Sequence, residues 1–184
     1  MGEGGYKIRD QGGVYFISFA VVCWVDVFMR KDYRDIVIES LRYCQQNKGL
    51  LIHSWCIMSN HVHLMVSARE NNLSDILRDF KKYTSKTIIQ AIEENKQESR
   101  REWMLKIFKE AGKKNSRNTG YQFWRQDNQP KECFGEKFTR QKLGYIHNNP
   151  VEAGVVERAE DYVYSSARDY YKGEQIGLLK VAFL

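Results

Sequence analysis

Residues 51–67 have the sequence LIHSWCIMSNHVHLMVS, and this stretch decides the fold that the rest of the chain is expected to form. Two apolar runs, 51–58 and 61–67, are separated by the dipeptide Ser59-Asn60. Apolar, β-rich runs joined by a two-residue turn are typical of a β-hairpin. We therefore predict two neighbouring antiparallel strands here.

Periodic patterns on both sides of this hairpin predict further elements. Before it, residues 31–47 have the apolar spacing of a helix, and Lys48-Gly49 follows as a stop signal. After it, residues 73–94 form a long amphipathic pattern. A β-branched and aromatic run that begins at Val14 predicts the first strand.

The C-terminal half adds two elements. We predict a fourth strand at 121–128 and a helix at 135–149 that Pro150 closes, because the residue before proline is disfavoured in the α region. The resulting order is β-α-β-β-α-β followed by an additional C-terminal helix. This order predicts an α+β, ferredoxin-like split βαβ fold, with an antiparallel sheet and two helices on one face.

The chain has 184 residues, of which 42% are hydrophobic. This predicts a single domain over 1–184, with a core at about 14–150 and a C-terminal tail at 151–184. No signal peptide is evident, and the longest apolar run is about 12 residues, shorter than the roughly 20 that span a membrane. We therefore expect a cytoplasmic protein with no membrane partner. The formal charge of +6 fits a polyanionic partner and a basic protein without one about equally well.

Two of the four histidines, His61 and His63, lie on the second strand of the hairpin. Alternate residues of a strand point to the same face, so the two imidazoles project together while Val62, Leu64 and Val66 project the other way. Such a pair can bind a metal ion, although an isolated His-x-His pattern is more often structural. The central position favours a metal, because burying two unpartnered imidazoles is costly.

The predicted helix at 135–149 offers a third ligand. Tyr145 and Asn149 are four residues apart and therefore share one helix face. The Asn149 carboxamide oxygen would complete a set of two nitrogens and one oxygen, which suits Mg²⁺ or Mn²⁺ better than a closed zinc site does. Taken alone, Tyr145 is more simply a half-buried aromatic and Asn149 a helix-terminal polar residue. His147 is expected at the surface.

A basic stripe is predicted on the helix at 73–94. Arg78, Lys82 and Lys86 recur every four residues, with Lys81 beside them. The stripe is either a phosphate-binding surface or an ordinary solvated helix face, and by itself the pattern favours the solvated face.

Three segments together carry a resemblance to a known family. They are MSNHVHLMVS at 58–67, FWRQDNQP at 123–130 and LGYIHNNPVEAGVVERAEDYVYSSARDYY at 143–171, with the basic helix between the first two. In this order and spacing they resemble the IS200-like single-tyrosine (Y1) transposases, and within these the branch of REP-associated tyrosine transposases. The resemblance extends from about Val14 to Tyr171.

The resemblance implies an HUH nuclease fold, named for its His-hydrophobic-His motif, that acts on single-stranded DNA. It places His61 and His63 on that motif, Tyr145 on the catalytic tyrosine, and Asn149 where relatives often have glutamine as a third metal ligand. With Mg²⁺ or Mn²⁺ polarising the scissile phosphate, tyrosine attack would give a 5′-phosphotyrosine and a free 3′-OH. Attack by the 3′-OH of a second strand would then complete a strand transfer.

The implied DNA partner is a hairpin-forming, REP-like single strand. The candidate contacts are the basic stripe and two residues of the predicted fourth strand, of which one is a tryptophan expected to stack on bases: Arg78, Lys81, Lys82, Lys86, Trp124 and Arg125.

Two other functions stay open from the sequence. A domesticated regulator would bind DNA hairpins without strand transfer, although the complete set of His61, His63 and Tyr145 argues against it. A cupin-type metal-dependent hydrolase or oxygenase also uses His-x-His on strands, but cupins are all-β and the two long predicted helices disfavour one. The sequence leaves open whether the protein is a monomer or a homodimer, and whether Tyr145 acts in its own subunit or in a partner.

Overall fold

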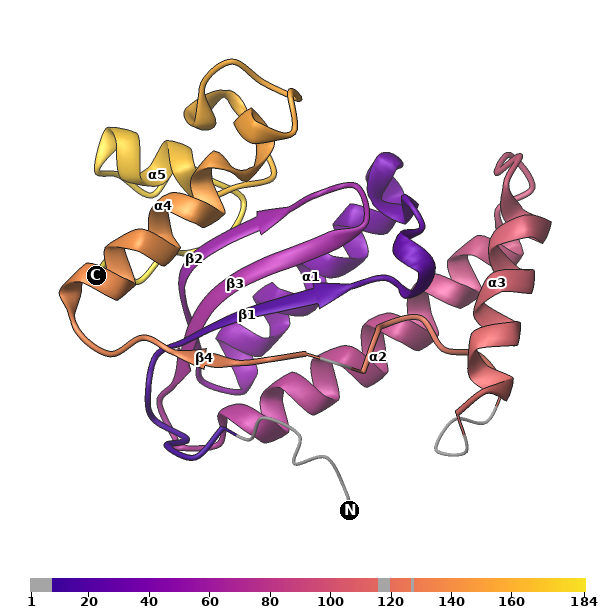
Figure 1. Cartoon of the computed structure of the whole chain (residues 1–184), viewed down its shortest axis with the longest axis horizontal. Coiled ribbons are helices and arrows are strands. Elements are labelled where there is room, and N and C mark those ends of the chain that lie inside the picture. The colour runs from indigo at the N-terminus through magenta and orange to yellow at the C-terminus, as the bar shows by residue number, and fades with distance from the viewer. Residues whose placement is uncertain (1–7, 116–119, 127) are drawn as a thin grey trace.

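The computed structural model describes residues 8–115, 120–126 and 128–184, and its centre is a four-stranded antiparallel sheet (Figure 1). The strands lie in the order β2-β3-β1-β4. Their bounds are β1 (Tyr15–Ala20), β2 (Leu50–Ile57), β3 (His61–Ala68) and β4 (Lys131–Glu132). Because β3 pairs between β1 and β2, the segment from β1 to β2 is a split βαβ unit, as predicted.

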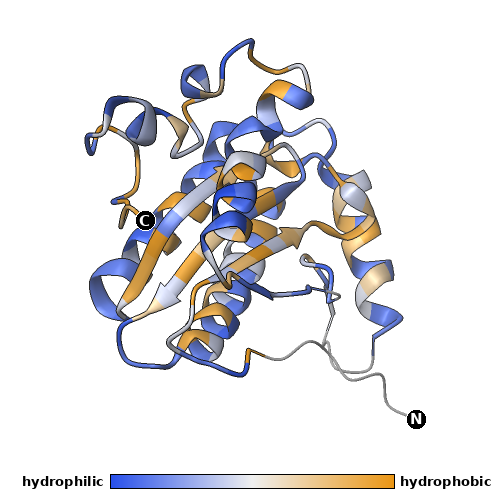
Figure 2. Ribbon diagram, turned by 60° about the vertical axis from the view of Figure 1, so that its left-hand side comes forward, coloured by the Kyte–Doolittle hydropathy of each residue, from blue (hydrophilic) through white to orange (hydrophobic). Residues whose placement is uncertain are grey.

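Two long helices, α1 (Lys31–Asn47) and α2 (Leu73–Glu94), cover one face of the sheet (Figure 1). Their bounds match the predicted helices. Leu41 of α1, Phe80 of α2 and Leu64 of β3 all belong to the main hydrophobic core there. Figure 2 shows hydrophobic residues concentrated in the strands and on the helix sides that face them. Burying each such side chain contributes about 1.5–3 kcal/mol, so this layer holds the fold together.

A second, smaller apolar cluster lies on the opposite face of the sheet. α4 (Glu136–Glu152) packs there through Ile146, in a cluster that includes Phe16 and Met65. The short helix α5 (Ala167–Lys172) follows on the same side (Figure 1). Since β3 has packed helices on both faces, its alternate side chains enter two different clusters.

The segment after α4 returns to the sheet along β2. It includes the 3-10 turn η3 (Ala159–Asp161), and Ser165 then forms a bridge with Cys56. Further along, the backbone N–H of Ala182 donates to the carbonyl of Ile52 at 2.8 Å. The C-terminal part of the chain therefore covers the edge strand.

At the other end of the sheet, the chain makes two 3-10 turns, η1 (Val22–Trp24) and η2 (Val27–Met29), between β1 and α1. α3 (Arg101–Lys113) packs beside them and buries Phe108 against Phe123. No helix in the described parts of the chain is long and apolar enough to cross a membrane.

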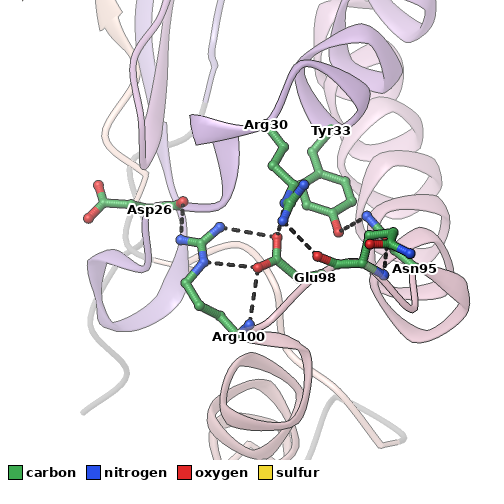
Figure 3. A network of polar contacts seen from close by, with 7 residues as sticks. Asp26, Arg30, Tyr33, Asn95, Glu98 and Arg100 are labelled. Atoms are coloured by element: carbon green, nitrogen blue, oxygen red, sulfur yellow. Dashed lines mark hydrogen bonds and ion pairs between the residues drawn. The ribbon is translucent and has the colours of Figure 1, made fainter.

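One buried carboxylate, Glu98, holds the connection between α2 and α3 (Figure 3). It accepts hydrogen bonds from Arg30 Nε at 2.6 Å and from Arg100 Nε at 3.1 Å. Arg100 Nη1 also donates to the backbone oxygen of Asp26 at 3.0 Å. Burial by itself raises the pKa of Glu98, but the bonds from the two arginines outweigh burial and hold the pKa below 4.5.

The prediction of a continuous fourth strand at 121–128 is wrong. This segment meets the end of β1 through a single bridge, between Trp124 and Val21, and ladder pairing starts at β4. Pro130 has no N–H to donate, so regular pairing begins only after it. Residue 127, within the predicted strand, lies outside the described residues.

α4 also continues past the proline that was predicted to close it. Pro150 lies in the last turn, where the Ala153 N–H still donates to the Asn149 carbonyl at 3.0 Å and the Val155 N–H donates to the Pro150 carbonyl at 2.9 Å. A proline this close to the end interrupts little of the helix. Asn149 therefore keeps helical geometry, one turn after Tyr145.

Candidate active site

His61 and His63 lie side by side on the face of β3 that α4 covers. Their ring centroids are 4.6 Å apart, and His63 is only 4% exposed. Val62, Leu64 and Val66 enter the main core on the other face, as strand alternation predicts.

Both rings are held at Nδ1, which leaves Nε2 for the site. His63 Nδ1 is 2.7 Å from Ser18 Oγ on the neighbouring strand β1. His61 Nδ1 is 2.7 Å from Asn60 Oδ1, and since a carboxamide oxygen can only accept, Nδ1 must carry the proton. The lone pair of His61 is therefore on Nε2.

The orientation of the Asn60 amide is set by its own NH₂ group. Asn60 Nδ2 donates to Asp26 Oδ1 at 3.1 Å and to the Trp24 carbonyl at 3.3 Å. Ser59 Oγ donates to the same Asp26 oxygen at 2.6 Å. Asp26 in turn accepts from Arg100 at its backbone oxygen, so the network of Figure 3 extends to His61.

Both imidazoles are held in their neutral form. Burial lowers the pKa of His61, and it lowers the pKa of His63 to about 3, with smaller contributions from the neighbouring His61 and Lys142. A neutral imidazole with a free lone pair is the form that binds a metal ion.

Asn149 lies opposite the histidine pair. Its Oδ1 is 3.3 Å from His61 Nε2, and both atoms present lone pairs when His61 is protonated at Nδ1. His63 Nε2 is buried and has no hydrogen-bond partner in the described structure. His61 Nε2 and Asn149 Oδ1 thus face each other as acceptors, and the buried His63 Nε2 has no partner among the described residues. A cation bound among these three atoms would give each of them a partner.

Tyr145, one turn before Asn149, lies on the same side of the histidines. Its ring is 5.1 Å from the His63 ring and 41% exposed, so it is reachable from solvent. The Lys142 ammonium is 5.5 Å from the centre of the Tyr145 ring. The structure thus brings together the four residues that the sequence proposed for the centre.

His147 fixes α4 on the sheet, and its predicted surface position is wrong. Its Nε2 lies 3.1 Å from Ser54 Oγ on β2 and 2.9 Å from Ser166 Oγ, and its ring packs against Tyr170. Burial lowers the pKa of His147 to about 4, so the ring is neutral. These contacts hold the helix that carries Tyr145 and Asn149.

The donor set fits a hard divalent ion better than a zinc ion. His61 Nε2 and Asn149 Oδ1 lie 3.3 Å apart and the His63 ring lies beside the His61 ring, which gives a mixed nitrogen and oxygen donor set. Within the described residues there is no cluster of three or more histidine, cysteine, aspartate or glutamate side chains that could hold a metal. The third ligand of the proposed site is therefore an amide.

The basic stripe lies on the other side of the sheet. Arg78, Lys81, Lys82 and Lys86 line a groove of about 1240 Å³ between α2 and residues 121–126 and 128–130. Apolar side chains of β1, including Ile17 and Phe19, form its floor. Arg78 is paired with Asp75 and Asp79, so its charge is partly neutralised.

Trp124 is not available for base stacking, contrary to the prediction. It is 4% exposed, and its Nε1 donates to Thr84 Oγ1 at 2.9 Å inside the core. Arg125 lies at the surface beside a different tryptophan, with its guanidinium 5.2 Å from the Trp24 ring centre.

Several residues of the site carried little signal in the sequence. Asn60 directly precedes the histidine motif, and Ser18 is a polar residue inside an apolar strand, so both could have been singled out. Trp24 and His147 could not, because their positions depend on contacts between distant segments.

The fold and the site define a class of protein: an α+β protein whose central antiparallel strand presents a histidine pair to a tyrosine on a covering helix. The chain belongs to the IS200-like transposase family, since the family described as "Transposase IS200 like" matches residues 19–119. Membership implies an enzyme that cleaves DNA. The match includes His61, His63 and the basic stripe, and it ends before Tyr145.

A solved structure supports the fold. The chain is similar to a REP-associated tyrosine transposase bound to a REP hairpin, with 18% identity, a TM-score of 0.65, and coverage of 94% of this chain and 88% of that one. It is also similar to a protein described as a transposase of Deinococcus radiodurans R1, with 17% identity, a TM-score of 0.45, and coverage of 80% and 97%. No curated protein matches the chain significantly.

Proposed function

We propose that this chain cleaves and rejoins single-stranded DNA through a covalent bond to Tyr145, at hairpin-forming, REP-like sequences. The observation that carries the proposal is the convergence of two distant segments on one point. The Tyr145 ring of α4 lies 5.1 Å from the His63 ring of β3, and Asn149 faces His61. This is the arrangement needed for a nucleophile beside a metal-held phosphate.

His61, His63 and Asn149 are the residues that would hold Mg²⁺ or Mn²⁺. When bound, such an ion withdraws charge from the scissile phosphate and orients it. Burial keeps both imidazoles neutral, so the ligands neither repel a cation nor cancel its charge. The ion's positive charge therefore stays available to the phosphate.

In the cleavage step, the phenol oxygen of Tyr145 bonds to phosphorus, and the bond from phosphorus to the 3′ oxygen breaks. The phenol loses its proton and the 3′ oxygen gains one, which gives a 5′-phosphotyrosine and a free 3′-OH. Lys142 provides a positive charge beside the developing phenolate. In the reverse step a second 3′-OH attacks the phosphotyrosine, which restores the phenol and joins two strands.

The groove against α2 supports a hairpin substrate. Its four basic side chains offer contacts to phosphates, and the structural relative with the same fold was solved with a REP hairpin bound. We propose that Arg78, Lys81, Lys82 and Lys86 contact the hairpin, with Arg125 close to the centre.

The test is the formation of a covalent adduct. Labelled single-stranded hairpin DNA is incubated with the protein and Mg²⁺ or Mn²⁺, and a species of reduced mobility is expected on a denaturing gel. Tyr145→Phe should abolish it, whereas Tyr43→Phe should not, since Tyr43 is 56% exposed on α1 at the opposite face. Hairpin binding without an adduct would instead indicate a regulator, and an adduct that survives Tyr145→Phe would exclude this nucleophile.

A further inference from the structure

Trp24 is a large aromatic residue left at the surface next to the candidate centre. It is 52% exposed, although it ends the short turn that follows the buried strand β1. The edge-to-face contact with His61, at 6.0 Å between ring centroids, places it at the rim of the site. Nothing in the proposed chemistry at Tyr145 requires an indole there.

The backbone holds this indole in an uncommon conformation. Cys23 and Trp24 have φ values of 53° and 54°, in the left-handed region that residues with a Cβ rarely adopt. The turn is maintained by the Trp24 N–H, which donates to the Val21 carbonyl at 3.1 Å, and by Asn60 Nδ2, which donates to the Trp24 carbonyl at 3.3 Å. Strain of this kind concentrates at functional sites, and here one amide positions both Trp24 and His61.

A continuous series of contacts leads from the centre to the basic groove by way of Trp24. Its first members are Tyr145, His63 and His61, whose rings are successive neighbours. Trp24 contacts His61, the Arg125 guanidinium lies 5.2 Å from the Trp24 ring centre, and Lys81 Nζ donates to the Arg125 carbonyl at 3.2 Å. Lys81 lines the groove.

We infer that Trp24 is a stacking platform for an unpaired nucleobase close to the scissile phosphate, and that the DNA strand passes over Trp24 and Arg125 into the groove against α2. The inference rests on the proposed single-stranded DNA substrate and names the residue that holds it at the rim. An exposed indole with an adjacent guanidinium is suited to such a strand, because the ring stacks on a base and the cation contacts the phosphate.

The first test measures binding of fluorescein-labelled single-stranded oligo(dT) in EDTA, where no cleavage occurs. Trp24→Gly should weaken binding about fivefold to 150-fold, the range of one base–aromatic stack. Trp24→Phe should retain most of the affinity, and Tyr43→Ala should leave it unchanged. Glycine suits the positive φ at position 24, so the variant should keep the wild-type melting temperature by circular dichroism.

The second test locates the contact. Oligo(dT) that contains iodouracil is irradiated with the wild-type protein, and the crosslinked peptide is identified by mass spectrometry. A crosslink at Trp24 is expected. Crosslinks only at other aromatic residues would overturn the inference, and so would unchanged oligo(dT) affinity in Trp24→Gly. A loss of affinity for duplex DNA as large as that for single strands would also overturn it, since paired bases cannot stack on the ring.

These outcomes separate the inference from the proposed function. If the wild-type protein forms no adduct but Trp24→Gly still loses affinity for single strands, the proposed cleavage through Tyr145 is wrong and base stacking on Trp24 is supported. If the adduct forms and Trp24→Gly binds oligo(dT) like the wild type, base stacking on Trp24 is wrong and the proposed cleavage through Tyr145 is supported.

Discussion

Asn60 determines which nitrogen of His61 faces the candidate centre. Its amide donates to Asp26 Oδ1 and to the Trp24 carbonyl, so its oxygen is left to accept the Nδ1 proton of His61. Partners of this kind orient a ligating imidazole and fix its tautomer. A residue that touches neither DNA nor metal in the proposal thus decides whether His61 is a competent ligand.

Replacing Asn60 with alanine should therefore weaken metal binding without removing a ligand. We expect Mn²⁺ affinity to fall about tenfold to a hundredfold, the usual effect of losing such a partner, as measured by isothermal titration calorimetry. Asn47→Ala, at the end of α1 on the other face, is the control and should bind Mn²⁺ like the wild type. Equal Mn²⁺ affinity in Asn60→Ala and wild type would show that the amide does not set the tautomer.

At the scale of elements, the centre depends on how two connections are held. His147 holds α4 to β2 and to the segment before α5, through Ser54 and Ser166. Glu98 holds the start of α3 and, through Arg100, the loop that carries Asp26. Both anchors lie outside the proposed chemistry, yet each positions a segment on which a site residue depends.

The Glu98 anchor predicts a pH-dependent stability. Its carboxylate is buried and paired with Arg30 and Arg100, so Glu98→Gln should lower the free energy of unfolding by about 2 kcal/mol at pH 7. Because the folded-state pKa is lowered, this contribution is fully present above pH 4.5 and is lost as the pH falls through the lowered value. The variant and the wild type should therefore converge in acid.

Urea unfolding between pH 7 and pH 3 measures this difference. The control is Glu39→Gln, which breaks an exposed pair with Arg42 and should change stability by less than about 1 kcal/mol at any pH. If the difference in free energy of unfolding between Glu98→Gln and the wild type were as large in acid as at pH 7, then packing around Glu98, and not its charge, would stabilise this connection.

At the scale of the whole molecule, the two proposed functional surfaces lie on opposite faces of one sheet. The histidine pair faces α4, while the basic groove opens beside α2. A strand that uses both must pass around the end of β1, where η1 and Arg125 lie. In the proposal, DNA recognition and the chemical step therefore take place on different faces of the sheet.

The groove predicts a salt-dependent affinity for DNA. Replacing Arg78, Lys82 and Lys86 together with alanine should reduce the slope of log affinity against log salt by up to about two for contacts to a single strand and up to about 2.7 for contacts to a duplex stem. The reduction is an upper value because Arg78 already pairs with Asp75 and Asp79. Fluorescence anisotropy with hairpin DNA at several salt concentrations measures it.

The matched control for the stripe is a triple alanine variant of exposed lysines on α3, at 106, 109 and 113. It removes the same charge from a different helix and should change the slope by less. Identical slopes in the stripe variant and the wild type would contradict a phosphate-binding groove.

One chain contains both halves of the proposed centre, because Tyr145 lies beside His63 of the same chain. We therefore predict that the tyrosine acts with the histidines of its own subunit. A mixture of Tyr145→Phe and His63→Ala proteins should then form no more adduct than either variant alone. Recovery of adduct in the mixture would show that the tyrosine is exchanged between subunits.

What the sequence determined by itself was local and periodic. Alternation along a strand put His61 and His63 on one face, and a four-residue spacing put Tyr145 and Asn149 on one side of a helix, because backbone geometry alone sets these relations. The two long helices and the hairpin were predictable for the same reason. The family resemblance linked the two halves, because it places His61, His63 and Tyr145 in one site.

What only the tertiary structure decided was which side chains are buried and which remain accessible. Trp124 and Trp24 are the same residue type near the same strand, yet one packs against Thr84 in the core and the other lies exposed beside His61. His147 is partly buried for the same kind of reason, since its ring bonds to Ser54 of β2 and to Ser166 before α5. Burial depends on contacts between segments far apart in the chain, and no local pattern records them.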